Sequence, residues 1–411
     1  MKYCLIGAKL NYSYSALIHG RFGLDYSLKE IPEENLAGFV KTCEYDGFNV
    51  TIPYKKAIIP YLDGVFGDAE KTGAVNTVVK RNGKLFGYNT DIAGLKYAFE
   101  RKGVTLKDKN VMILGGGGAA AVAQFVAESA GARRIDTVRR NGKLNYENCY
   151  DLKDTEIIIN ATPVGTFPNV NETPICPEKF PALLFVMDMT YNPSETELIR
   201  LAKLAGAKTS SGLSMLVKQA ICSEEIWENL TLPETLSEDT VKWLCIKQSN
   251  LVLIGMPSSG KTALGKIIAA KLGKSFIDTD EEIFKTTGVL PENIIISDGE
   301  KAFRDKESAA IKNAATSFNS VIATGGGAIL RPENMEFLSK NGVICYVMRD
   351  LSLLSTKGRP LSRDMGVEKL FEVRAPLYEK YCDFKVKNDG DINDTVKEII
   401  RKYEDTCDKR A

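Results

Sequence analysis

The chain has 411 residues, of which 44% are hydrophobic and 26% charged, and its formal net charge is +1. This length predicts more than one domain, and the balanced charge gives no reason to expect a nucleic-acid partner. No apolar run is long enough to span a membrane, and we expect no signal peptide because the first residues already form a predicted strand. The nine cysteines include no C-x-x-C pair, which predicts free thiols and a cytoplasmic protein.

Short β-rich runs alternate with helical periods along most of the chain, which predicts an α/β protein with mostly parallel sheets. The first part contains Asn82-Gly83 between two apolar runs, a pattern typical of a β-hairpin. A long amphipathic helix is expected to pack back on this part, and a polar linker with a short helix capped by Ser237 follows it. The expected boundaries are 1–103, 104–211, the helix at 212–230, the linker at 231–248, and 249–411.

The run "ILGGGGAAA" follows a predicted strand and begins a predicted helix. Gly115, Gly117 and Ala120 fit the G-x-G-x-x-A pattern, in which glycines let the backbone approach the pyrophosphate of a dinucleotide. Four adjacent glycines are also compatible with a mobile loop. The strand–glycine–helix context favours dinucleotide binding.

The next predicted strand, "RRIDTV", indicates which dinucleotide binds. A site for NAD usually places an acidic residue near the end of this strand, to hold the ribose 2′-hydroxyl. Here the strand ends in Arg139, Arg140 and Asn141, and the nearest acid, Asp136, lies in its middle. Guanidinium groups suit the 2′-phosphate of NADP, so we expect NADP.

Hydride transfer to a ketone requires a proton donor. The only histidine, His19, lies on a predicted helix after the segment "SYS", where a structural role fits better. The alternative is a lysine beside a carboxylate, and Lys55 in "NVTIPYK" and Asp91 in "GYNTD" supply one. A lone lysine is ordinarily a solvated surface charge. The joint occurrence of these segments with "GAVNT" instead predicts a site at a sheet edge.

Residues 1 to about 230 resemble shikimate dehydrogenases in every major motif and in order. The resemblance implies an α/β substrate domain, a Rossmann domain that binds NADP, and the NADPH-dependent reduction of 3-dehydroshikimate to shikimate. Lys55 would pass a proton to the substrate oxygen, and Asp91 would orient Lys55. Near the N-terminus, Lys9, Tyr12 and Ala16 replace a proline, a histidine and a proline of the family motif.

The same resemblance implies the remaining site residues of this half. The substrate would be held by Ser13, Ser15, Thr51, Lys55, Asn76, Asp91, Tyr191 and Gln219. The cofactor NADP would be held by Gly115, Gly117, Gly118, Ala119, Arg139, Arg140, Asn141, Thr162 and Met215. In the family's clamp for the 2′-phosphate, only the central arginine, Arg140, is preserved.

The stretch "LIGMPSSGKTALGK" fits the P-loop pattern G-x-x-x-x-G-K-T through Gly255, Gly260, Lys261 and Thr262. It lies between an apolar strand and a helix, the context that the motif requires. Backbone N–H groups cradle the phosphates, Lys261 reaches the outer ones, and Thr262 holds Mg²⁺. The motif predicts a nucleoside triphosphate such as ATP, but it does not identify the acceptor.

Acidic and basic residues downstream point to the acceptor. Asp278 and Asp280 in "FIDTD" are expected at the end of the next strand, on one side of it, because strand side chains alternate. One can serve Mg²⁺, and the other can orient or deprotonate a hydroxyl. Glycines and arginines that suit a small carboxylate follow at Gly325, Gly326, Gly327, Arg304, Arg359 and Arg374. Solvated surface charge is the alternative for these acids and arginines.

Residues 249–411 resemble shikimate kinases along the whole stretch. ATP would be held by Gly255, Ser258, Ser259, Gly260, Lys261, Thr262, Ala263 and the lid residue Arg359. Shikimate would be held by Asp280, Arg304, Gly326, Gly327 and Arg374, with Asp280 and Lys261 in catalytic roles and Mg²⁺ at Thr262 and Asp278. The lid is expected to be short, and the usual arginine ahead of "RP" is missing, with Lys357 the nearest cation.

Together these patterns predict a bifunctional enzyme of chorismate and aromatic amino acid biosynthesis, acting on small molecules. It would make shikimate and then shikimate 3-phosphate. Alternatives are a fused dehydrogenase that oxidises quinate with NAD, a non-catalytic metabolite-sensing regulator and a generic P-loop ATPase. A regulator should have lost catalytic residues, yet Lys55, Asp91, Lys261, Asp278 and Asp280 are all present. The sequence predicts neither the oligomeric state nor transfer of shikimate between sites.

Overall fold

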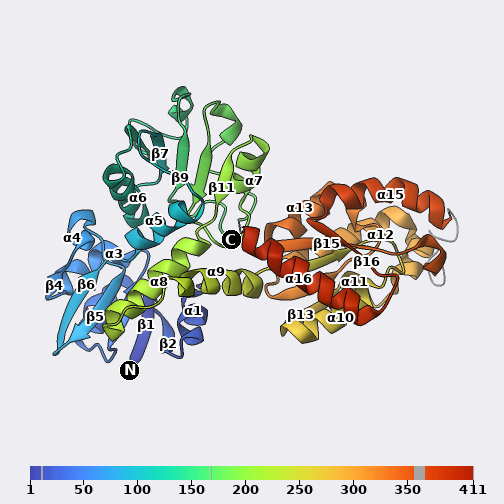
Figure 1. Ribbon diagram of the computed structural model, residues 1–411, viewed down its shortest axis with the longest axis horizontal. Coiled ribbons are helices and arrows are strands. Elements are labelled where there is room, and N and C mark those ends of the chain that lie inside the picture. The colour runs from blue at the N-terminus through green and yellow to red at the C-terminus, as the bar shows by residue number, and fades with distance from the viewer. Residues whose placement is uncertain (11–12, 168, 356–365, 411) are drawn as a thin grey trace. The chain divides into compact units, whose positions relative to one another are not determined.

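The computed structural model describes residues 1–10, 13–167, 169–355 and 366–410 (Figure 1). The chain divides into two compact units, residues 1–241 and 242–410. Helices alternate with strands in both units, and most strand pairs are parallel, so the predicted α/β class is confirmed. In the described part of the chain, no helix is both long and apolar enough to cross a lipid bilayer.

The first unit begins with a six-stranded sheet in the spatial order β2-β1-β3-β5-β6-β4. Its strands are β1 (Lys2–Gly7), β2 (Asp25–Glu30), β3 (Gly47–Val50), β4 (Gly64–Val65), β5 (Thr77–Arg81) and β6 (Lys84–Tyr88). Its helices are α1 (Ser15–Arg21), α2 (Leu36–Lys41), α3 (Tyr54–Ala57) and α4 (Asp68–Thr72). Strands β5 and β6 are antiparallel and join through Asn82 (φ 51°) and Gly83 (φ 78°), which confirms the predicted hairpin.

A second sheet in the same unit has five parallel strands in the order β11-β10-β9-β7-β8. Its strands are β7 (Asn110–Leu114), β8 (Arg134–Val138), β9 (Ile157–Asn160), β10 (Phe185–Asp188) and β11 (Lys208–Ser210), with helices α6 (Gly118–Ser129) and α7 (Glu197–Leu204). Strand β7 pairs with β8 on one side and β9 on the other. The chain therefore reverses its direction of winding at β7, and the glycine run lies at this switch point, where open α/β sheets bind ligands.

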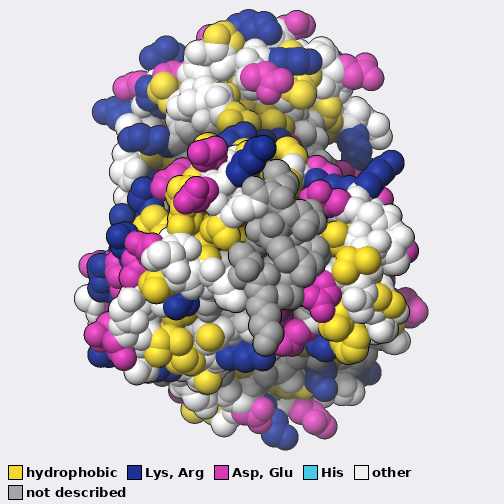
Figure 2. Space-filling model, turned by 90° about the vertical axis from the view of Figure 1, so that its right-hand side faces the viewer, with side chains coloured by type: hydrophobic (Ala, Val, Ile, Leu, Met, Phe, Trp, Pro, Cys, Tyr) yellow, Lys and Arg dark blue, Asp and Glu magenta, His cyan; other side chains and the backbone are white. Residues whose placement is uncertain are grey.

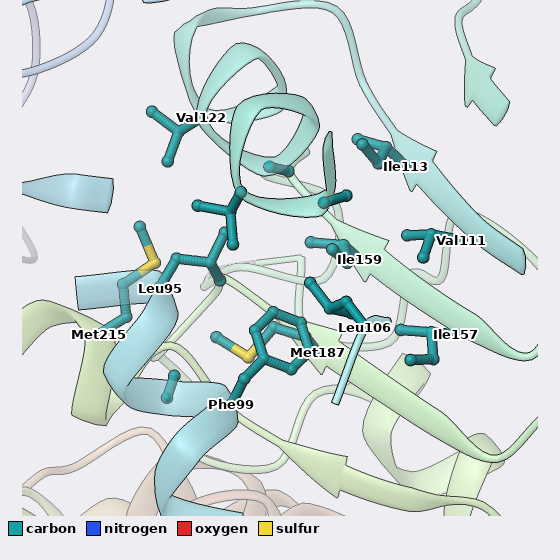
Figure 3. Close-up of a cluster of buried hydrophobic side chains, with 14 of the residues drawn as sticks. Leu95, Phe99, Leu106, Val111, Ile113, Val122, Ile157, Ile159, Met187 and Met215 are labelled. Atoms are coloured by element: carbon teal, nitrogen blue, oxygen red, sulfur yellow. The ribbon is translucent and has the colours of Figure 1, made fainter. Parts of the chain in front are cut away.

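Two helices cover the second sheet and connect it to the first: α5 (Asp91–Arg101) and α8 (Leu213–Glu228). Figure 3 shows Leu95 and Phe99 of α5 and Met215 of α8 in one buried cluster with side chains of the sheet. A Cβ atom at Gly94 would lie 2.5 Å from the carbonyl oxygen of Met215, so the close approach of α5 to α8 requires glycine at this position.

Helix α8 is buried on more than the one apolar face that its sequence predicts. Its polar residues Gln219, Ser223 and Glu224 are buried along with its apolar ones. At its C-terminal end, Trp227 donates from Nε1 to the carbonyl oxygen of Val78 (2.9 Å) and so reaches the first sheet. The buried polar face of α8 therefore needs partners inside the unit, because an unpaired polar group in the interior is costly.

The second unit contains a five-stranded parallel sheet in the order β13-β14-β12-β15-β16. Its strands are β12 (Asn250–Ile254), β13 (Ser275–Asp278), β14 (Ser320–Ala323), β15 (Gly342–Met348) and β16 (Phe384–Lys387). Its helices are α10 (Lys261–Leu272), α11 (Thr279–Thr287), α12 (Pro291–Ala315), α13 (Pro332–Asn341), α15 (Val367–Tyr381) and α16 (Ile392–Arg410). The P-loop follows the central strand β12. On the face shown in Figure 2, basic and acidic side chains are interspersed.

Between the units, the predicted linker contains α9 (Thr235–Gln248). The helix begins two residues before Ser237, so the prediction that Ser237 caps it is wrong. Backbone turns start the helix instead, because Leu236 N donates to Pro233 O (3.0 Å). Early in α9, Glu238 accepts two hydrogen bonds from Arg101 of the first unit (2.8 and 2.9 Å). Near its end, Cys245 Sγ donates to the carbonyl oxygen of Cys407 in the second unit (3.2 Å).

Candidate active sites

Lys55 and Asp91 form an ion pair in the first unit. Lys55 lies in α3, just after β3, and Asp91 is the first residue of α5. The Lys55 Nζ donates to Asp91 Oδ2 at 2.5 Å, and the two side chains are 17% and 9% exposed. Asn76 Nδ2 donates to the other carboxylate oxygen of Asp91 at 3.0 Å. The carboxylate is thus fixed from two sides, and it holds the lysine at a partly open position.

Asn76 is itself held by residues from distant segments of the chain. Its Oδ1 accepts from the backbone N–H of Thr90 (2.7 Å), and its Nδ2 lies 3.3 Å from Gln219 Oε1 on α8. Behind these residues, Thr77 Oγ1 lies 2.8 Å from Ser223 Oγ. The structure therefore brings Lys55, Asp91, Asn76 and Gln219, four predicted site residues, into one hydrogen-bonded cluster.

The predicted serines lie at the start of α1. Ser13 Oγ accepts from the backbone N–H of Ser15 at 3.2 Å. Next to this turn in the same lobe, the Tyr26 hydroxyl donates to Asn49 Oδ1 at 2.8 Å. Asn49 Nδ2 in turn lies 3.2 Å from the carbonyl oxygen of Asn76. Tyr26 is thus connected to the Asn76 cluster through Asn49.

Two other predicted substrate residues border this region. Thr51 lies in the turn between β3 and α3, where its carbonyl oxygen accepts from Tyr54 N at 2.8 Å. Tyr191 follows β10 of the second sheet, and its ring contacts that of Tyr14, with 5.4 Å between the ring centroids. The structure does not bring Thr51 or Tyr191 into direct hydrogen-bond contact with Lys55 or Asp91 among the residues it describes.

His19 occupies a different environment from the Lys55–Asp91 pair. It is completely buried, its Nδ1 lies 2.7 Å from Glu224 Oε1, and its ring stacks on Tyr26. Burial lowers the pKa of His19 to about 3 and raises the pKa of Glu224 to about 8. A buried imidazole in this environment is a structural residue of the core.

The glycine run after β7 makes a turn that only glycine can form. Gly115 has a φ angle of 121°, and a Cβ there would lie 3.1 Å from the carbonyl oxygen of Ala161 and 3.3 Å from Thr162 Cγ2. Gly117 directly precedes α6. A Cβ at Gly118 would lie 3.6 Å from Cδ of Lys55, so the turn and the lysine border the same space. A dinucleotide on this helix N-terminus would therefore lie beside Lys55.

The arginines after β8 fit a phosphate at the glycine turn. Arg139, Arg140 and Asn141 are exposed, and the Arg139 side chain lies 3.3 Å from where a Cβ of Gly116 would be. Asp136 lies within β8 and accepts a hydrogen bond from Arg134 Nε at 2.7 Å. A cationic edge without a free acid suits a 2′-phosphate better than a 2′-hydroxyl.

The remaining predicted cofactor residues lie around the same turn. Ala119 is in the first turn of α6, and Met215 is a member of the buried cluster in Figure 3. Thr162 Oγ1 donates to Asn160 Oδ1 at 2.7 Å, and Asn160 Nδ2 donates to Asp188 Oδ1 at 3.0 Å. Burial raises the pKa of Asp188 to about 6. These bonds fasten the loop after β9 to the end of β10.

In the second unit, the P-loop has the backbone that phosphate binding requires. Gly255 and Gly260 have φ angles of 147° and 95°, and a Cβ at either position would collide with Val347 O or Asn388 Nδ2. Asn388 Nδ2 donates to the carbonyl oxygen of Ser259 at 2.8 Å, which fastens the loop. Lys261 Nζ lies 2.9 Å from the carbonyl oxygen of Gly255, so its ammonium is held at the loop.

The other predicted nucleotide residues belong to the same loop and helix. Ser258 has a φ angle of 67°, and its hydroxyl donates to the carbonyl oxygen of Ser355 at 2.7 Å. The Ser259 hydroxyl is buried and has no hydrogen-bond partner within the described ranges. Ala263 is exposed in the first turn of α10. The loop thus presents backbone N–H groups at a helix N-terminus, an arrangement that binds phosphate.

Thr262 and Asp278, the residues expected to hold a cation, are in direct contact. Thr262 Oγ1 donates to Asp278 Oδ2 at 2.7 Å. Asp278 is the last residue of β13, and its Oδ1 accepts from the backbone N–H of Asp280 at 3.0 Å, so it caps α11. The expectation that strand alternation aligns the two acids is wrong, because the strand ends at Asp278 and Asp280 lies in the first turn of a helix.

The three glycines after β14 lie against the charged groups of the second unit. A Cβ at Gly325 would lie 3.1 Å from Asp280 Oδ1, and a Cβ at Gly327 would collide with the Arg304 guanidinium. Arg374 Nη1 donates to the carbonyl oxygen of Gly326 at 3.2 Å. Arg304 and Arg374 are only 7% and 4% exposed, so they are fixed cations rather than solvated surface charges.

Comparison with known families and structures assigns both units. The family model of the shikimate dehydrogenase substrate binding domain matches residues 5–78, and the shikimate kinase model matches residues 257–404. The shikimate dehydrogenase (NADP(+)) of Clostridium beijerinckii is 36% identical over 257 residues, which cover 57% of this chain and 95% of that protein. The chain belongs to the shikimate dehydrogenase family.

Solved structures agree with this assignment. The crystal structure of shikimate dehydrogenase 1 from Peptoclostridium difficile is 35% identical, with a TM-score of 0.56, and the match covers 59% of this chain and 98% of that one. A chorismate mutase/shikimate 5-dehydrogenase fusion protein from Clostridium acetobutylicum is also 35% identical, with a TM-score of 0.56 and coverage of 59% and 96%. The chain therefore joins a shikimate dehydrogenase unit to a shikimate kinase domain.

Several residues that the sequence patterns did not single out complete the dehydrogenase site. Ser223 lies on the same face of α8 as Gln219, four residues earlier, and receives a hydrogen bond from Asn49 Nδ2 at 3.0 Å. Asn49 belongs to the segment "NVTIPYK" that carries Lys55. The i, i+4 spacing after Gln219 is the signal that could have identified Ser223.

The kinase site has similar additional residues. Glu307 is completely buried, and its Oε2 accepts from Arg304 Nη1 at 2.7 Å. Its Oε1 has no hydrogen-bond partner among the described residues and lies 2.5 Å from where a Cβ of Gly325 would be. Glu307 follows Arg304 by three residues in a helix, which is a spacing that pairs opposite charges. Arg359 and Lys357 lie outside the described residues.

Proposed function

We propose that the chain catalyses two consecutive reactions. The dehydrogenase unit reduces 3-dehydroshikimate to shikimate with NADPH, and the kinase unit transfers a phosphoryl group from ATP to the 3-hydroxyl of shikimate. The observation that carries the first assignment is the Lys55–Asp91 pair at 2.5 Å, whose lysine borders the glycine turn at Gly118. The second assignment rests on the P-loop beside the buried Arg304 and Arg374.

In the reductase step, Lys55 passes a proton to the substrate oxygen as that oxygen gains charge. Bound NADPH supplies the hydride. Asp91 holds the lysine in place, and Asn76 keeps Asp91 oriented through its hydrogen bond of 3.0 Å. Proton transfer by a positioned side chain contributes roughly 10²–10⁴-fold to turnover. Ser13, Ser15, Thr51, Tyr191 and Gln219 bind the carboxylate and hydroxyl groups of the substrate.

In the kinase step, Asp280 orients the acceptor hydroxyl and takes its proton. Lys261 and the P-loop N–H groups hold the phosphates, and Arg304 and Arg374 bind the substrate carboxylate beside Gly326 and Gly327. Thr262 and Asp278, joined at 2.7 Å, would hold Mg²⁺. Mg²⁺ keeps several waters and needs only one or two protein oxygens besides the phosphates, so this small donor set suits it.

We propose three domains and a linker, with the boundaries expected from the sequence. A substrate domain would contain residues 1–103 with the helix at 212–230, an NADP domain residues 104–211, and a kinase domain residues 249–411, after a linker at 231–248. The packing of α8 on α5 supports the assignment of the helix at 212–230. All nine cysteines are free thiols, which supports a cytoplasmic location.

The test is a sequential reaction in a single tube. The purified chain is incubated with 3-dehydroshikimate and NADPH, Mg²⁺ and ATP are added later, and the products are followed by mass spectrometry. We expect shikimate first and shikimate 3-phosphate only after ATP is added. Shikimate that persists after ATP is added would refute the kinase assignment. If 3-dehydroshikimate is not consumed, the reductase assignment is refuted. NADH and quinate are tested in parallel as the alternative cofactor and substrate.

A further inference from the structure

Tyr14 and Tyr191 form a ring pair that joins the two lobes of the dehydrogenase unit. Tyr14 directly precedes α1, in the lobe of the first sheet, and Tyr191 follows β10 of the second sheet. The ring centroids are 5.4 Å apart, and the ring planes are inclined by 49°. Such tilted aromatic pairs are stabilising beyond the area that they bury.

The ring pair lies next to the part of the site that is predicted to bind the substrate carboxylate. Tyr14 stands between Ser13 and Ser15, whose turn is closed by the hydrogen bond from Ser15 N to Ser13 Oγ. Ser15 is 5% exposed, so the turn is packed into the lobe of the first sheet. The Tyr14 ring is therefore carried by a residue inside the closed serine turn.

The chemistry of the pair points to packing rather than charge. Burial raises the pKa of Tyr191 to about 12 and raises that of Tyr14 as well, so both rings remain neutral phenols at the pH of the reaction. Within the described ranges, neither hydroxyl makes a hydrogen bond to a protein side chain that would hold its ring in place. The Tyr14 ring is therefore a packing partner of Tyr191 rather than a hydrogen-bond partner.

We propose that Tyr14 is a positioning residue for the substrate: its ring holds Tyr191 over the serine turn, so that the serines and Tyr191 together bind the carboxylate of a small polyhydroxylated acid. The proposal rests on the proposed reductase function. The middle residue of the S-x-S segment thereby sets how tightly the two lobes hold the substrate. Loss of the ring weakens substrate binding, whereas the proton transfer from Lys55 does not depend on it.

The expected effect is a change in KM with little change in kcat, because the ring pair acts on ground-state and transition-state binding alike. For Tyr14→Ala, we expect KM for 3-dehydroshikimate to rise roughly threefold to tenfold, the range that corresponds to one aromatic pair. Tyr14→Phe should behave as the wild-type chain, because it keeps the ring. The dissociation constant for NADPH should not change, since the nearest neighbours of the glycine turn are Ala161, Arg139 and Lys55.

The experiment compares four variants: Tyr14→Ala, Tyr14→Phe, Tyr191→Ala and the double variant with alanine at both positions. Tyr61→Ala is the matched control, because Tyr61 is a 45% exposed tyrosine of the same lobe. NADPH binding followed by fluorescence shows that the dehydrogenase unit of each variant is folded, and the kinase rate should be unchanged. In the Tyr191→Ala background, Tyr14→Ala should have little further effect on KM. Additive effects of the two substitutions, or a Tyr14→Phe variant as impaired as Tyr14→Ala, would overturn the proposal.

Failure of the proposed function is recognised separately. If the wild-type chain does not reduce 3-dehydroshikimate, the reductase assignment fails, and calorimetric binding of shikimate is measured for the same variants. If Tyr14→Phe binds shikimate as tightly as the wild-type chain and Tyr14→Ala binds it more weakly, the result supports the role of Tyr14. Equal affinities in all variants, or no binding to the wild-type chain, overturn it.

Discussion

Lys55 and Lys56 are neighbours in α3 with very different surroundings. Lys55 donates to the buried Asp91, whereas the side chain of Lys56 is exposed. We expect Lys55→Ala to lower reductase turnover by at least roughly 10²-fold, because the substrate oxygen loses its proton donor. Lys56→Ala should leave turnover unchanged. Steady-state kinetics with 3-dehydroshikimate and NADPH measure both.

NADPH binding provides the control for the Lys55 variant. The glycine turn keeps its own contacts with Ala161 and Arg139, so the dissociation constant for NADPH should stay close to that of the wild-type chain. Unchanged turnover in the Lys55 variant would remove Lys55 from the mechanism. An equal loss in the Lys56 variant would show that the effect comes from the fold or the charge of α3.

The buried pair of His19 and Glu224 makes the stability of the dehydrogenase unit depend on pH. Burial raises the pKa of Glu224 from 4.5 to about 8, so the free energy of unfolding falls as the pH rises across that interval. Burial lowers the pKa of His19 from 6.5 to about 3, so the free energy of unfolding rises with pH over that lower interval. Above about pH 6.5 only the Glu224 effect remains, and we expect a loss of about 2 kcal/mol by pH 8.

Urea unfolding followed by tryptophan fluorescence tests this slope. The ring centroids of Trp227 and His19 are 5.2 Å apart. In a Trp243→Phe background, Trp227 is the only tryptophan of the chain. Glu224→Gln should flatten the dependence between pH 6.5 and 8, since no carboxyl remains that is protonated in the folded chain and ionised in the unfolded chain. Glu100→Gln, an exposed glutamate of α5, should keep it. A slope that persists in Glu224→Gln would assign the effect to another group.

At the scale of elements, the close packing of α5 against α8 carries the reductase site. Helix α5 begins with Asp91, α8 contributes Gln219, and Gly94 lies where the helices meet. We expect Gly94→Ala to lower the free energy of unfolding by roughly 1–3 kcal/mol, because its Cβ would lie 2.5 Å from a backbone oxygen of α8. Gly38→Ala in α2, where nothing lies within 4 Å, should be neutral or slightly stabilising. Denaturant unfolding measures the free energy of unfolding of both variants and so tests this prediction.

Local signals in the sequence were sufficient for the elements that carry strict backbone requirements. The Asn82-Gly83 hairpin and the strand–glycine–helix turns depend on residue types that tolerate positive φ angles. Their positions can therefore be predicted from the sequence alone. The two glycine loops could be located for the same reason, because their motifs are short and contiguous.

Other features depend on contacts between distant segments and leave no local pattern. The polar residues of α8 look like a solvent-facing side, but Ser223 is buried against Asn49, which lies 174 residues earlier. Asp280 looks like a strand residue until the hydrogen bond from its backbone to Asp278 starts a helix. Only the tertiary fold reveals which of these polar groups have buried partners.

At the scale of the whole molecule, the two activities should be separable by single substitutions. Lys261→Ala should abolish phosphoryl transfer, because the P-loop loses the ammonium held beside Gly255, and should leave NADPH oxidation intact. Lys55→Ala should have the reverse effect. Lys266→Ala, a 57% exposed lysine of α10, is the matched control and should preserve both. Coupled assays with each substrate alone measure the two rates, and loss of both in one variant would contradict independent catalysis.

Helix α9 limits how this gene could be divided into two. Its early residue Glu238 neutralises Arg101 through two hydrogen bonds, and its late residue Cys245 contacts the backbone of Cys407. A chain break before the helix leaves the Arg101 guanidinium without its carboxylate, and a break after it leaves the last helix without the cysteine. Two separate enzymes could keep all of these native contacts only if each had its own copy of α9. Dividing the gene at a single point is therefore disfavoured, whereas dividing it with the α9 segment duplicated would preserve both sets of contacts.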